Sequence, residues 1–588
     1  MEKLDEGRGN RERVVILGSG WAGFTVARTL DSSKFQTVVV SPRSYFAFTP
    51  LLASTAVGTL EFRTALEPVR SRRTSVEFFQ GWADDVDFKN RTITIEEAVD
   101  DPKQGVALTT DRHAGETKEE REMEKKKDAK VGRLFDLQYD KLVVTVGCYS
   151  QTFGTPGVKE HAFFLKDVGD ARRIRNRILA CFEAAALPTT SVEMKKQLLN
   201  FAVVGGGPTG IEFSAELHDL INEDMKKLYP ELVQYHKITV YDVAEKVLPM
   251  FDKRLAGYAM QKFKRRGIDI KTSHHVEELR PGAPVERSMS DDLDDYHLYT
   301  LKVKEEGEIG VGMCVWSTGL MQNPFVDHAL SSVREAPTDL HLPSSSSVPD
   351  KDVKWIVKKD PKSGSIITDD HLRVKLIPSS PSQQNEQSSS QPEAIHPSVF
   401  ALGDCGIIQD TTYPATAQVA SQKAFWLAKR LNKGDLSPSS PSESKGFTYK
   451  DLAMCILICN LAELVLRIAL FFMQAIEMCQ TNSSELSHVK HDMHTTPSKR
   501  PQDKRHVVAE PIDDNIPGLY PDQILTPRYC NLTFLRDYQS PRAINETFCD
   551  DPLYDFHPWK TNVPGSRQKS SYIIQTHAKF GIEIQYPI

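Results

Sequence analysis

Three glycines at a fixed spacing constrain this chain more than any other feature of its sequence. Gly205, Gly207 and Gly210 follow the apolar run 201–204 and precede an amphipathic segment. The first glycine permits a tight turn, the second lets a phosphate approach the backbone, and the third lets a helix pack close to a strand. Unpaired N–H groups and the helix dipole favour an anion at that point. The stretch therefore predicts the strand, turn and helix of a dinucleotide-binding βαβ unit.

The next strand of this unit is predicted at residues 237–242, and it ends in a carboxylate, Asp242. An acid at this position can accept hydrogen bonds from both ribose hydroxyls and would repel a 2′-phosphate. It therefore favours NADH over NADPH. The crossover that leads to Asp242 is longer than the usual spacing of about 20 residues.

A second fingerprint lies near the N-terminus. An apolar strand, 13–17, leads into three glycines at the same spacing, Gly18, Gly20 and Gly23. The second strand, 37–40, ends at Ser41, where an acid usually holds the adenosine ribose and a serine can make one hydrogen bond. A proline-bounded aromatic segment with Arg43 follows, and a plain core loop would look similar. A glycine cluster alone is compatible with a simple turn, but two of them indicate two nucleotides bound face to face, as in flavoprotein reductases.

Charge and cysteine usage exclude several classes of protein. The 588 residues include 73 basic and 79 acidic side chains, a net charge of −6, which gives no argument for a nucleic-acid partner. The nine cysteines include no C-x-x-C or metal-ligand pair, so we expect no metal site and no disulfide framework.

The first twelve residues are polar and include four acids, unlike a secretory signal or a transit peptide. We therefore expect a reducing compartment, and either no import through a cleaved presequence or a missing N-terminus.

Further strands are predicted to end at residues suited to a ligand. Gly147 and Gly319 each close a strand, and Asp404 follows another strand shortly before a helix that starts near Ala417. In open α/β sheets, ligands bind beyond the carboxyl ends of the strands. Asp404 could accept hydrogen bonds from a ribityl chain, although an aspartate after a glycine more often caps a turn.

Taken together, these motifs resemble one family. The segments that carry the resemblance are GSGWAGF, SPRSYFAFTPLL, YDKLVVTVG, TFGTPGV, GGGPTGIEFSAEL, KVLPMFDKRL, VWSTG, FALGDC and ATAQVASQ. They resemble the type II (alternative, rotenone-insensitive, non-proton-pumping) NADH:ubiquinone oxidoreductases, most of all the fungal mitochondrial ones. The resemblance covers residues 12–450 apart from insertions. Singly, only GGGPTGIEF and AQVASQ point beyond the wider group of flavoproteins with two dinucleotide-binding domains.

The resemblance implies a ping-pong cycle. NADH gives a hydride to FAD, NAD⁺ leaves, and the reduced flavin passes two electrons to ubiquinone. The residues implied for FAD are Gly18, Gly20, Gly23, Ser41, Arg43, Gly147, Asp404 and Ala417. The residues implied for NADH are Gly205, Gly207, Gly210, Asp242 and Gly319.

Three further residues are implied in the chemistry. Glu212 matches the glutamate that lies close to the nicotinamide in this family, although an acid in the first turn of a helix also meets the helix dipole. Gln418 and Gln422 match the stretch that lies against the flavin and the quinone head. Their amides offer two donors and two acceptors each, which suits a dione, and their spacing places them on one helical face.

The predicted fold class is α/β, with two Rossmann-like dinucleotide-binding domains, one for FAD and one for NADH, and a divergent C-terminal region that is membrane-associated or disordered. The predicted segments are an N-terminal tail at 1–12, the first part of the FAD domain at 13–170 with a charged insertion at 100–130, the NADH domain at 171–325, a low-complexity insertion at 333–394, the second part of the FAD domain with the quinone-site helix at 395–450, an apolar helix at 452–478 and a tail at 479–588.

The C-terminal part departs from the family. The segment 452–478 is about as long as a membrane span, but its polar residues Asn460, Glu463, Arg467 and Gln474 form one stripe. This favours a helix in an interface or against a partner over a spanning or buried helix. The histidines between residues 488 and 494 are interpreted as part of a solvated tract rather than a metal site. The family suggests a peripheral protein of the mitochondrial inner membrane and a homodimer.

Other functions stay open at the level of sequence. A disulfide reductase needs a dithiol beside the flavin, and the first domain offers none. A sulfide-oxidising relative would need two cysteines beside the flavin, for which Cys148 and Cys405 are the candidates. The chain is alternatively a catalytically impaired flavoprotein, or a nucleotide-binding interaction protein, that kept both βαβ units and lost quinone turnover.

Overall fold

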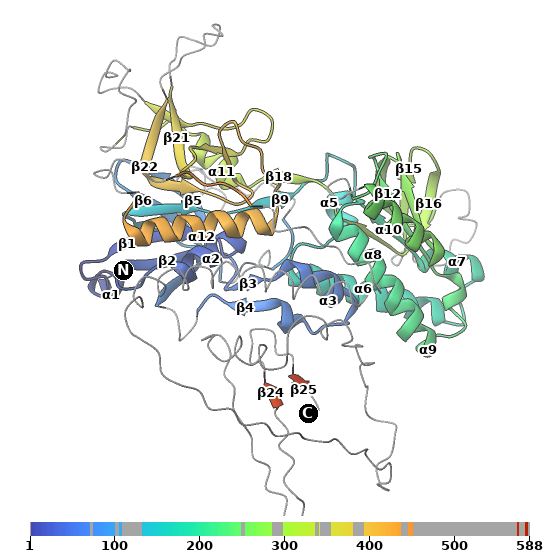
Figure 1. Ribbon diagram of the computed structural model, residues 1–588. Coiled ribbons are helices and arrows are strands. Elements are labelled where there is room, and N and C mark those ends of the chain that lie inside the picture. Colours follow the sequence, from blue (N-terminus) through green and yellow to red (C-terminus); the bar gives the residue numbers. More distant parts are fainter. Residues whose placement is uncertain are drawn as a thin grey trace, which may run out of the picture. The chain divides into compact units, whose positions relative to one another are not determined.

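Figure 1 shows the computed structural model of the protein. The residues that it describes are 2–70, 75–99, 101, 105–108, 132–248, 253–284, 298–335, 340, 354–379, 393–436, 445–450, 573–575 and 583–585. Met1–Phe472 forms one compact unit and Met473–Ile588 another. In the second unit, only the paired strands β24 (Ile573–Gln575) and β25 (Glu583–Gln585) are described.

Several predicted segments lie outside the described residues. They are the apolar helix at 452–478, nearly all of the tail at 479–588, and most of the charged insertion at 100–130. Among the residues that are described, no helix has the length and apolar character needed to cross a bilayer.

The first domain is built on a parallel sheet. Its central strands lie in the order β22 (Ala394–Ala401), β8 (Lys141–Val144), β1 (Glu12–Leu17), β2 (Phe35–Ser41) and β5 (Val76–Asp87). Every residue of β2 is buried, and so is β1 after its first residue. Strands covered on both faces read as continuous apolar runs, which is why these two were visible in the sequence.

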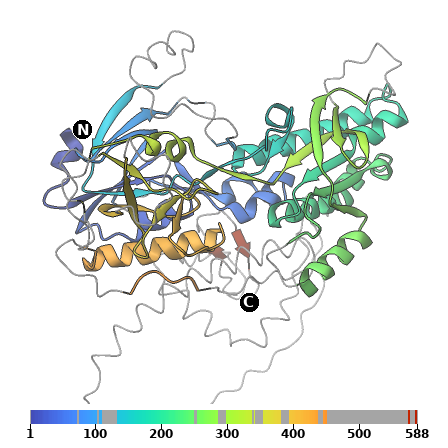
Figure 2. The same cartoon turned by 90° about the horizontal axis from the view of Figure 1, so that it is seen from above.

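Helices and antiparallel strands complete this domain. The helices α2 (Trp21–Thr29) and α12 (Ala417–Lys433) pack side by side, as Figures 1 and 2 show. Antiparallel strands β6 (Thr92–Glu97) and β7 (Leu134–Gln138) extend the sheet beyond β5. The shorter elements are β3 (Tyr45–Ala47), the 3₁₀ helix η1 (Thr49–Leu51), α3 (Leu52–Val57), the 3₁₀ helix η2 (Phe62–Ala65), β4 (Leu66–Pro68), α11 (Pro324–Asp327) and the 3₁₀ helix η6 (Ala329–Ser331).

The prediction of a low-complexity insertion at 333–394 is wrong for its central part. Three strands lie there, β19 (Trp355–Val357), β20 (Ile366–Thr368) and β21 (Arg373–Pro378). β21 pairs with β22 and with β19, and β20 pairs with β21 and with β23 (Gly406–Ile408), so all of them extend the large sheet. In β21, buried and partly buried residues alternate. This period of two indicates a strand, but it is short and the Ser- and Pro-rich flanks concealed it.

The N-terminal residues also differ from the predicted tail. Residues Glu2–Glu6 form a helix, α1, whose Leu4 is buried. Arg13 pairs with Asp5 at 2.5 Å, and the Gln36 amide donates to the Leu4 carbonyl at 2.6 Å. The segment therefore packs on the first domain, because an arginine at the start of β1 and a glutamine in β2 provide polar partners for it.

The second domain contains a five-stranded parallel sheet in the order β10 (Phe163–Phe164), β17 (Met313–Trp316), β11 (Asn200–Val204), β12 (Lys237–Asp242) and β13 (Ile268–Thr272). Its longer helices are α6 (Val168–Ala186), α8 (Pro208–Leu220) and α10 (Lys253–Arg265). Since β10 belongs to this sheet, the chain enters the second domain before the predicted boundary at residue 171.

The remaining elements of this domain are short. They are α5 (Val158–His161), α7 (Val192–Leu198), a π-helical turn η3 (Ile221–Met225), α9 (Lys226–Leu228), the 3₁₀ helix η4 (Val233–Tyr235) and an antiparallel sheet of β14 (Val276–Pro281), β15 (Tyr299–Val303) and β16 (Gly307–Val311). The chain passes between the domains at β9 (Cys148–Ser150) and β18 (Leu320–Gln322), which pair antiparallel. The two segments that connect the domains are therefore held together by the pairing of β9 with β18.

Candidate functional site

The first glycine of each fingerprint has a backbone conformation that other residues rarely adopt. Gly18 has φ +107° and Gly205 has φ +120°. A Cβ on Gly18 would lie 2.4 Å from the carbonyl oxygen of Thr145, and one on Gly205 would lie 2.8 Å from the hydroxyl of Ser317. Both positions therefore require glycine for conformation and for space.

The other two glycines of each fingerprint differ in their surroundings. A Cβ on Gly23 would lie 2.0 Å from the Gly18 carbonyl oxygen, and one on Gly210 would lie 2.0 Å from that of Gly205. By contrast, a Cβ on Gly20 or Gly207 would meet no atom within 4 Å. Gly20 and Gly207 are the N-caps of α2 and α8, and neither helix has a side-chain cap. The space beside the middle glycine of each turn is thus open, and an anion could bind there at the N-terminus of the helix.

Two hydroxyl residues hold these turns in the same way, although the sequence analysis did not single them out. The Thr145 hydroxyl donates to the Leu17 carbonyl at 2.7 Å, and the Ser317 hydroxyl donates to the Val204 carbonyl at 3.0 Å. Thr145 and Ser317 each stand two residues before a closing glycine, Gly147 or Gly319. The repeated hydroxyl-x-Gly spacing is the signal that would have identified them.

The strand ends beside the two turns carry the predicted ribose residues. The Asp242 carboxylate accepts from the Gly206 N–H and, at 2.7 Å, from the Ala244 N–H. At the equivalent end of β2, the buried Ser41 hydroxyl lies 2.9 Å from that of Ser19. The structure therefore places both residues against their glycine turns, and their contacts with a ribose stay predictions.

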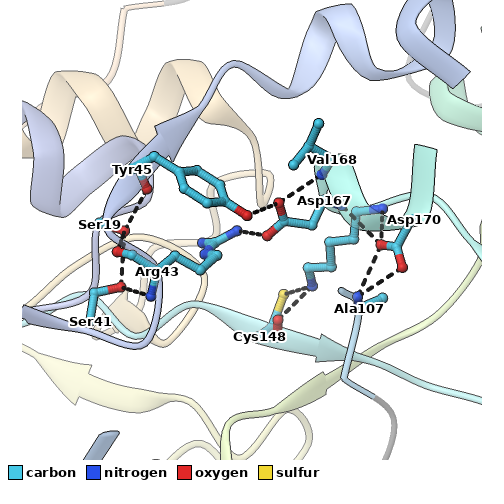
Figure 3. Close-up of polar contacts among 10 residues, drawn as sticks. Ser19, Ser41, Arg43, Tyr45, Ala107, Cys148, Asp167, Val168 and Asp170 are labelled. Carbon is cyan, nitrogen blue, oxygen red and sulfur yellow. Dashed lines mark hydrogen bonds and ion pairs between the residues drawn. The ribbon is translucent and has the colours of Figure 1, made fainter. Parts of the chain in front are cut away.

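Arg43 follows Ser41 and is held by an acid of the second domain (Figure 3). Its guanidinium forms an ion pair with Asp167, the N-cap of α6, and the Tyr45 hydroxyl donates to the same carboxylate at 3.0 Å. Burial acts to lower the pKa of Arg43, but the neighbouring Asp167 carboxylate outweighs it and raises that pKa. Arg43 is therefore a fixed cation at the end of β2.

Two neighbouring strands, β8 and β22, are followed in the chain by Cys148 and Asp404, whose side chains meet. The Cys148 thiol donates to Asp404 at 3.2 Å, and the Lys166 ammonium lies 3.2 Å from the same sulfur. Burial raises the pKa of Cys148 to about 12, with Lys166 opposing, and it raises the pKa of Cys405 to about 11. Burial thus favours the neutral thiol at both residues, and this does not support the sulfide-oxidising alternative, which needs reactive thiolates.

Gly147 and Gly319 turn the chain out of each sheet into the connecting strands. Their φ values are +68° and +79°. A Cβ on Gly319 would lie 2.7 Å from the ring of Phe153. Phe153 itself has φ +54° and is 61% exposed. A positive φ on an exposed aromatic residue is uncommon, and the sequence analysis gave Phe153 no role of its own within the TFGTPGV segment.

The helix α12 presents the two predicted glutamines. Thr416 caps its first turn, so Ala417 is its first residue. The Tyr449 hydroxyl donates to the Gln418 amide oxygen. The Gln422 amide donates to the Lys450 carbonyl at 2.8 Å and accepts from the Lys450 N–H at 3.0 Å. The glutamines share one face of α12, and the chain's own segment at 449–450 binds that face.

Lys423, the next residue along α12, is a buried cation that the sequence analysis missed. Its side chain is 3% exposed, and its ammonium donates to the Gly406 carbonyl at 3.1 Å. Burial lowers the pKa of Lys423 to about 8, while Cys405 and the Asp404 carboxylate oppose this shift. A lysine that follows a polar helical residue is ordinarily solvated, so the sequence carried no signal for it.

Glu212 lies half-buried on α8, one turn before a fully buried acid, Glu216. The Glu216 carboxylate accepts from the Ser54 hydroxyl at 3.2 Å and from the Thr59 hydroxyl at 3.0 Å. Burial raises the pKa of Glu212 to about 8, and Glu216 adds to this shift. Burial also raises the pKa of Glu216 to about 7, while the hydroxyls of Thr59 and Ser54 oppose it. The sequence analysis identified Glu212 and missed Glu216, although their spacing of four places both on one helical face.

One group in the described part of the chain has the composition of a metal site. Ligand atoms of Asp369, Asp370 and His371 lie within 4.8 Å of one another. However, Arg373 pairs with Asp369 at 2.8 Å, and the His371 ring bonds Asp370 at 2.6 Å. These contacts explain the cluster without an ion, and we assign no metal to it.

Two parallel sheets, each with a glycine turn open at a helix N-terminus, define an oxidoreductase fold with two dinucleotide-binding domains. This confirms the predicted fold class. The chain belongs to the pyridine nucleotide-disulphide oxidoreductase family, whose sequence profile matches residues 12–335, and its curated relatives are the type II NADH dehydrogenases that the motifs resemble.

Three relatives illustrate this. The chain is 35% identical to a probable NADH dehydrogenase of Dictyostelium discoideum, over 75% of this chain and 78% of that protein. It is 34% identical to the external alternative NAD(P)H-ubiquinone oxidoreductase B1, mitochondrial, of Solanum tuberosum, over 74% and 77%. It is 32% identical to a probable mitochondrial NADH-ubiquinone oxidoreductase of Schizosaccharomyces pombe, over 72% and 63%.

A solved structure shows the same fold. The structure of NDH2 from Plasmodium falciparum in complex with NADH matches this chain with a TM-score of 0.54 and 22% identity. The match covers 75% of this chain and 87% of the other.

Proposed function

We propose that this chain is a FAD-dependent NADH dehydrogenase that passes a hydride from NADH to FAD and two electrons on to ubiquinone without pumping protons. The observation that carries the proposal is the pair of open glycine turns. In each, the outer glycines are required by the packing, whereas the middle one, Gly20 or Gly207, has free space in front of an uncapped helix. Such a turn is built for a pyrophosphate, and the relatives are named as NADH-ubiquinone oxidoreductases.

FAD is the redox group of this family and fits the first domain. It supplies the hydride acceptor and the route for electrons, while the protein binds and orients it. The turn with Gly18, Gly20 and Gly23 would hold its pyrophosphate, with Ser41 and Arg43 on the adenosine side. Gly147, Asp404 and Ala417 would lie along the flavin side.

NADH fits the second domain. The turn with Gly205, Gly207 and Gly210 would hold its pyrophosphate, and Asp242 would bind its ribose. Gly319 would pass near the nicotinamide, and Glu212 on α8 would lie beside it.

For ubiquinone we propose the face of α12 that carries Gln418 and Gln422. Amides can donate to a quinone oxygen, but both of these are bonded by Tyr449 and Lys450. A quinone head would therefore bind beside these contacts or displace them. Peripheral attachment to the mitochondrial inner membrane and a homodimer are further parts of the proposal. They are supported by the mitochondrial names of the relatives and by the family resemblance respectively.

The test is to follow the visible absorbance of the flavin in purified protein under anaerobic conditions. Addition of NADH should bleach the flavin, and a short-chain ubiquinone should then restore it. Bleaching without recovery would contradict the quinone half-reaction and favour an impaired flavoprotein. Protein without flavin would favour a nucleotide-binding interaction protein.

A further inference from the structure

Two acids stand one turn apart on α8, the helix that packs on α3 of the first domain. Glu212 and Glu216 are one turn apart, a spacing that puts Cβ atoms about 5–6 Å from each other. Glu216 is 1% exposed, and Glu212 is half-buried. At this place α8 packs on α3, and both hydroxyls that bind Glu216 come from the chain around α3, Ser54 within it and Thr59 just after it. Glu216 therefore lies in the contact between the two domains, and Glu212 stands one turn before it on α8.

The surroundings of the two acids are unequal. Hydroxyl donors favour the ionised form of a carboxyl group, and Glu216 has two of them. Burial disfavours the ionised form of Glu212, and the charge of Glu216 disfavours it further. When two acids interact in this way, they lose their protons in two steps. Glu216 ionises first, and the remaining proton stays on Glu212.

Other charges near the pair do not reverse this order. Neither α3 nor β11, which pack on α8, contains a titratable side chain. Asp219 on α8 and Glu223 on η3 raise the pKa of Glu216. The strand β12, with Lys237, Tyr241 and Asp242, also packs on α8. Arg175 of α6 lies against Gly58, the residue before Thr59.

We propose that Glu216, once it has ionised, is the charged partner that delays the ionisation of Glu212 beyond neutral pH, so that α8 presents an uncharged acid to the nicotinamide ring. The proposal rests on the proposed function, in which Glu212 lies beside that ring. The ring is uncharged in NADH and carries a positive charge in NAD⁺. A carboxylate next to it would hold NAD⁺ by Coulomb attraction, whereas a neutral acid would not. Glu216 is thus a positioning residue that acts through Glu212 and favours release of NAD⁺.

The test is the dissociation constant of NAD⁺ for the flavin-loaded protein, measured without quinone from about pH 6 to about pH 10. In the unchanged protein, NAD⁺ should bind about fivefold more tightly once Glu212 has ionised. The midpoint of this change should lie near the pKa of Glu212, which burial raises to about 8. Glu216→Gln removes the repelling charge, so its midpoint should fall by about one pH unit. Glu212→Gln should abolish the change.

Two further variants make the test specific. Thr59→Val keeps the shape of the side chain and removes one donor to Glu216, so Glu216 should ionise at higher pH and the midpoint for NAD⁺ should fall as well. Glu231→Gln, which alters an exposed acid of the same domain, should leave the midpoint unchanged. Thr59→Val also serves as the test if Glu216→Gln does not fold with its flavin.

The proposal is wrong if Glu216→Gln and Thr59→Val keep the midpoint of the unchanged protein. It is also wrong if Glu212→Gln still shows the change, since another group would then be titrating. Failure of ubiquinone turnover would overturn the proposed function and leave this result standing, because NAD⁺ binding is measured without quinone.

Discussion

At the scale of single residues, we expect Asp242 to decide which nicotinamide cofactor fits the second domain. Two backbone N–H groups, those of Gly206 and Ala244, hold its carboxylate at the end of β12. Asp242→Asn removes the charge that would repel a 2′-phosphate and keeps the shape of the side chain. The ratio of kcat/KM for NADH to that for NADPH should fall about tenfold, which corresponds to about 1.4 kcal/mol.

The matched control is Asp269→Asn. This exposed acid stands on the neighbouring strand β13 and pairs with Lys237 at 3.7 Å. Its replacement should leave the ratio unchanged. An unaltered ratio in Asp242→Asn would show that Asp242 does not discriminate between the cofactors.

Gln418 provides a second prediction at this scale. If the face of α12 binds the quinone head, Gln418→Leu should lower kcat/KM for ubiquinone by about tenfold through loss of a polar contact. Bleaching of the flavin by NADH, measured by stopped flow, should change little, because NADH would bind in the second domain and the proposal gives Gln418 no contact with it. Gln234→Leu alters an exposed glutamine of the second domain and should affect neither half-reaction. Equal loss in both half-reactions would place Gln418 outside the quinone site.

At the scale of elements, different glycines of one turn are expected to serve cofactor binding and folding stability. Gly207→Ala adds a methyl group in open space at φ −76°, which alanine adopts easily. The domain should therefore keep its stability, while NADH should bind about tenfold more weakly because the phosphate meets the methyl group. Isothermal titration calorimetry and urea unfolding measure the two effects.

Gly210→Ala is the matched variant of the same turn. Its Cβ would lie 2.0 Å from the Gly205 carbonyl oxygen, so α8 has to move away from β11. We expect a loss of roughly 2 to 4 kcal/mol in the free energy of unfolding. Equal stability of the two variants would contradict this account of the turn.

At the scale of the whole molecule, the buried acids make stability depend on pH. The pKa of Glu216 is raised to about 7 in the folded protein, mainly by burial, so the folded state holds this proton more tightly than the unfolded state. Its contribution is fully present below the unfolded pKa of about 4.3 and is lost as pH rises through the folded pKa. The stability of Glu216→Gln relative to the unchanged protein should therefore increase between about pH 5 and about pH 8.

The measurement is urea unfolding of both proteins across this range. Glu231→Gln, an exposed acid, should show no such trend relative to the unchanged protein. A constant difference between Glu216→Gln and the unchanged protein would mean that Glu216 titrates normally in the folded state.

The sequence by itself determined the two nucleotide-binding turns and the strands that lead into them. Gly18 and Gly205 need a positive φ, and Gly23 and Gly210 need room for a neighbouring carbonyl; both demands arise within six residues of chain. The strands β1 and β2 are visible for a similar reason, since burial on both faces requires an unbroken apolar run. Local requirements of this kind restrict the residue types directly, so they can be recognised without the fold.

Only the tertiary structure decided which distant residues meet. Ser54 and Glu216 are 162 residues apart, and Cys148 and Asp404 are 256 apart. The sequence shows a serine, a cysteine and two acids, and nothing in their local pattern indicates which of these side chains meet. The ionisation of Glu212, the occupied amides on α12 and the place of β21 in the large sheet all depend on such contacts. Burial and partnership are set by packing across the whole unit, and local periodicity does not encode them.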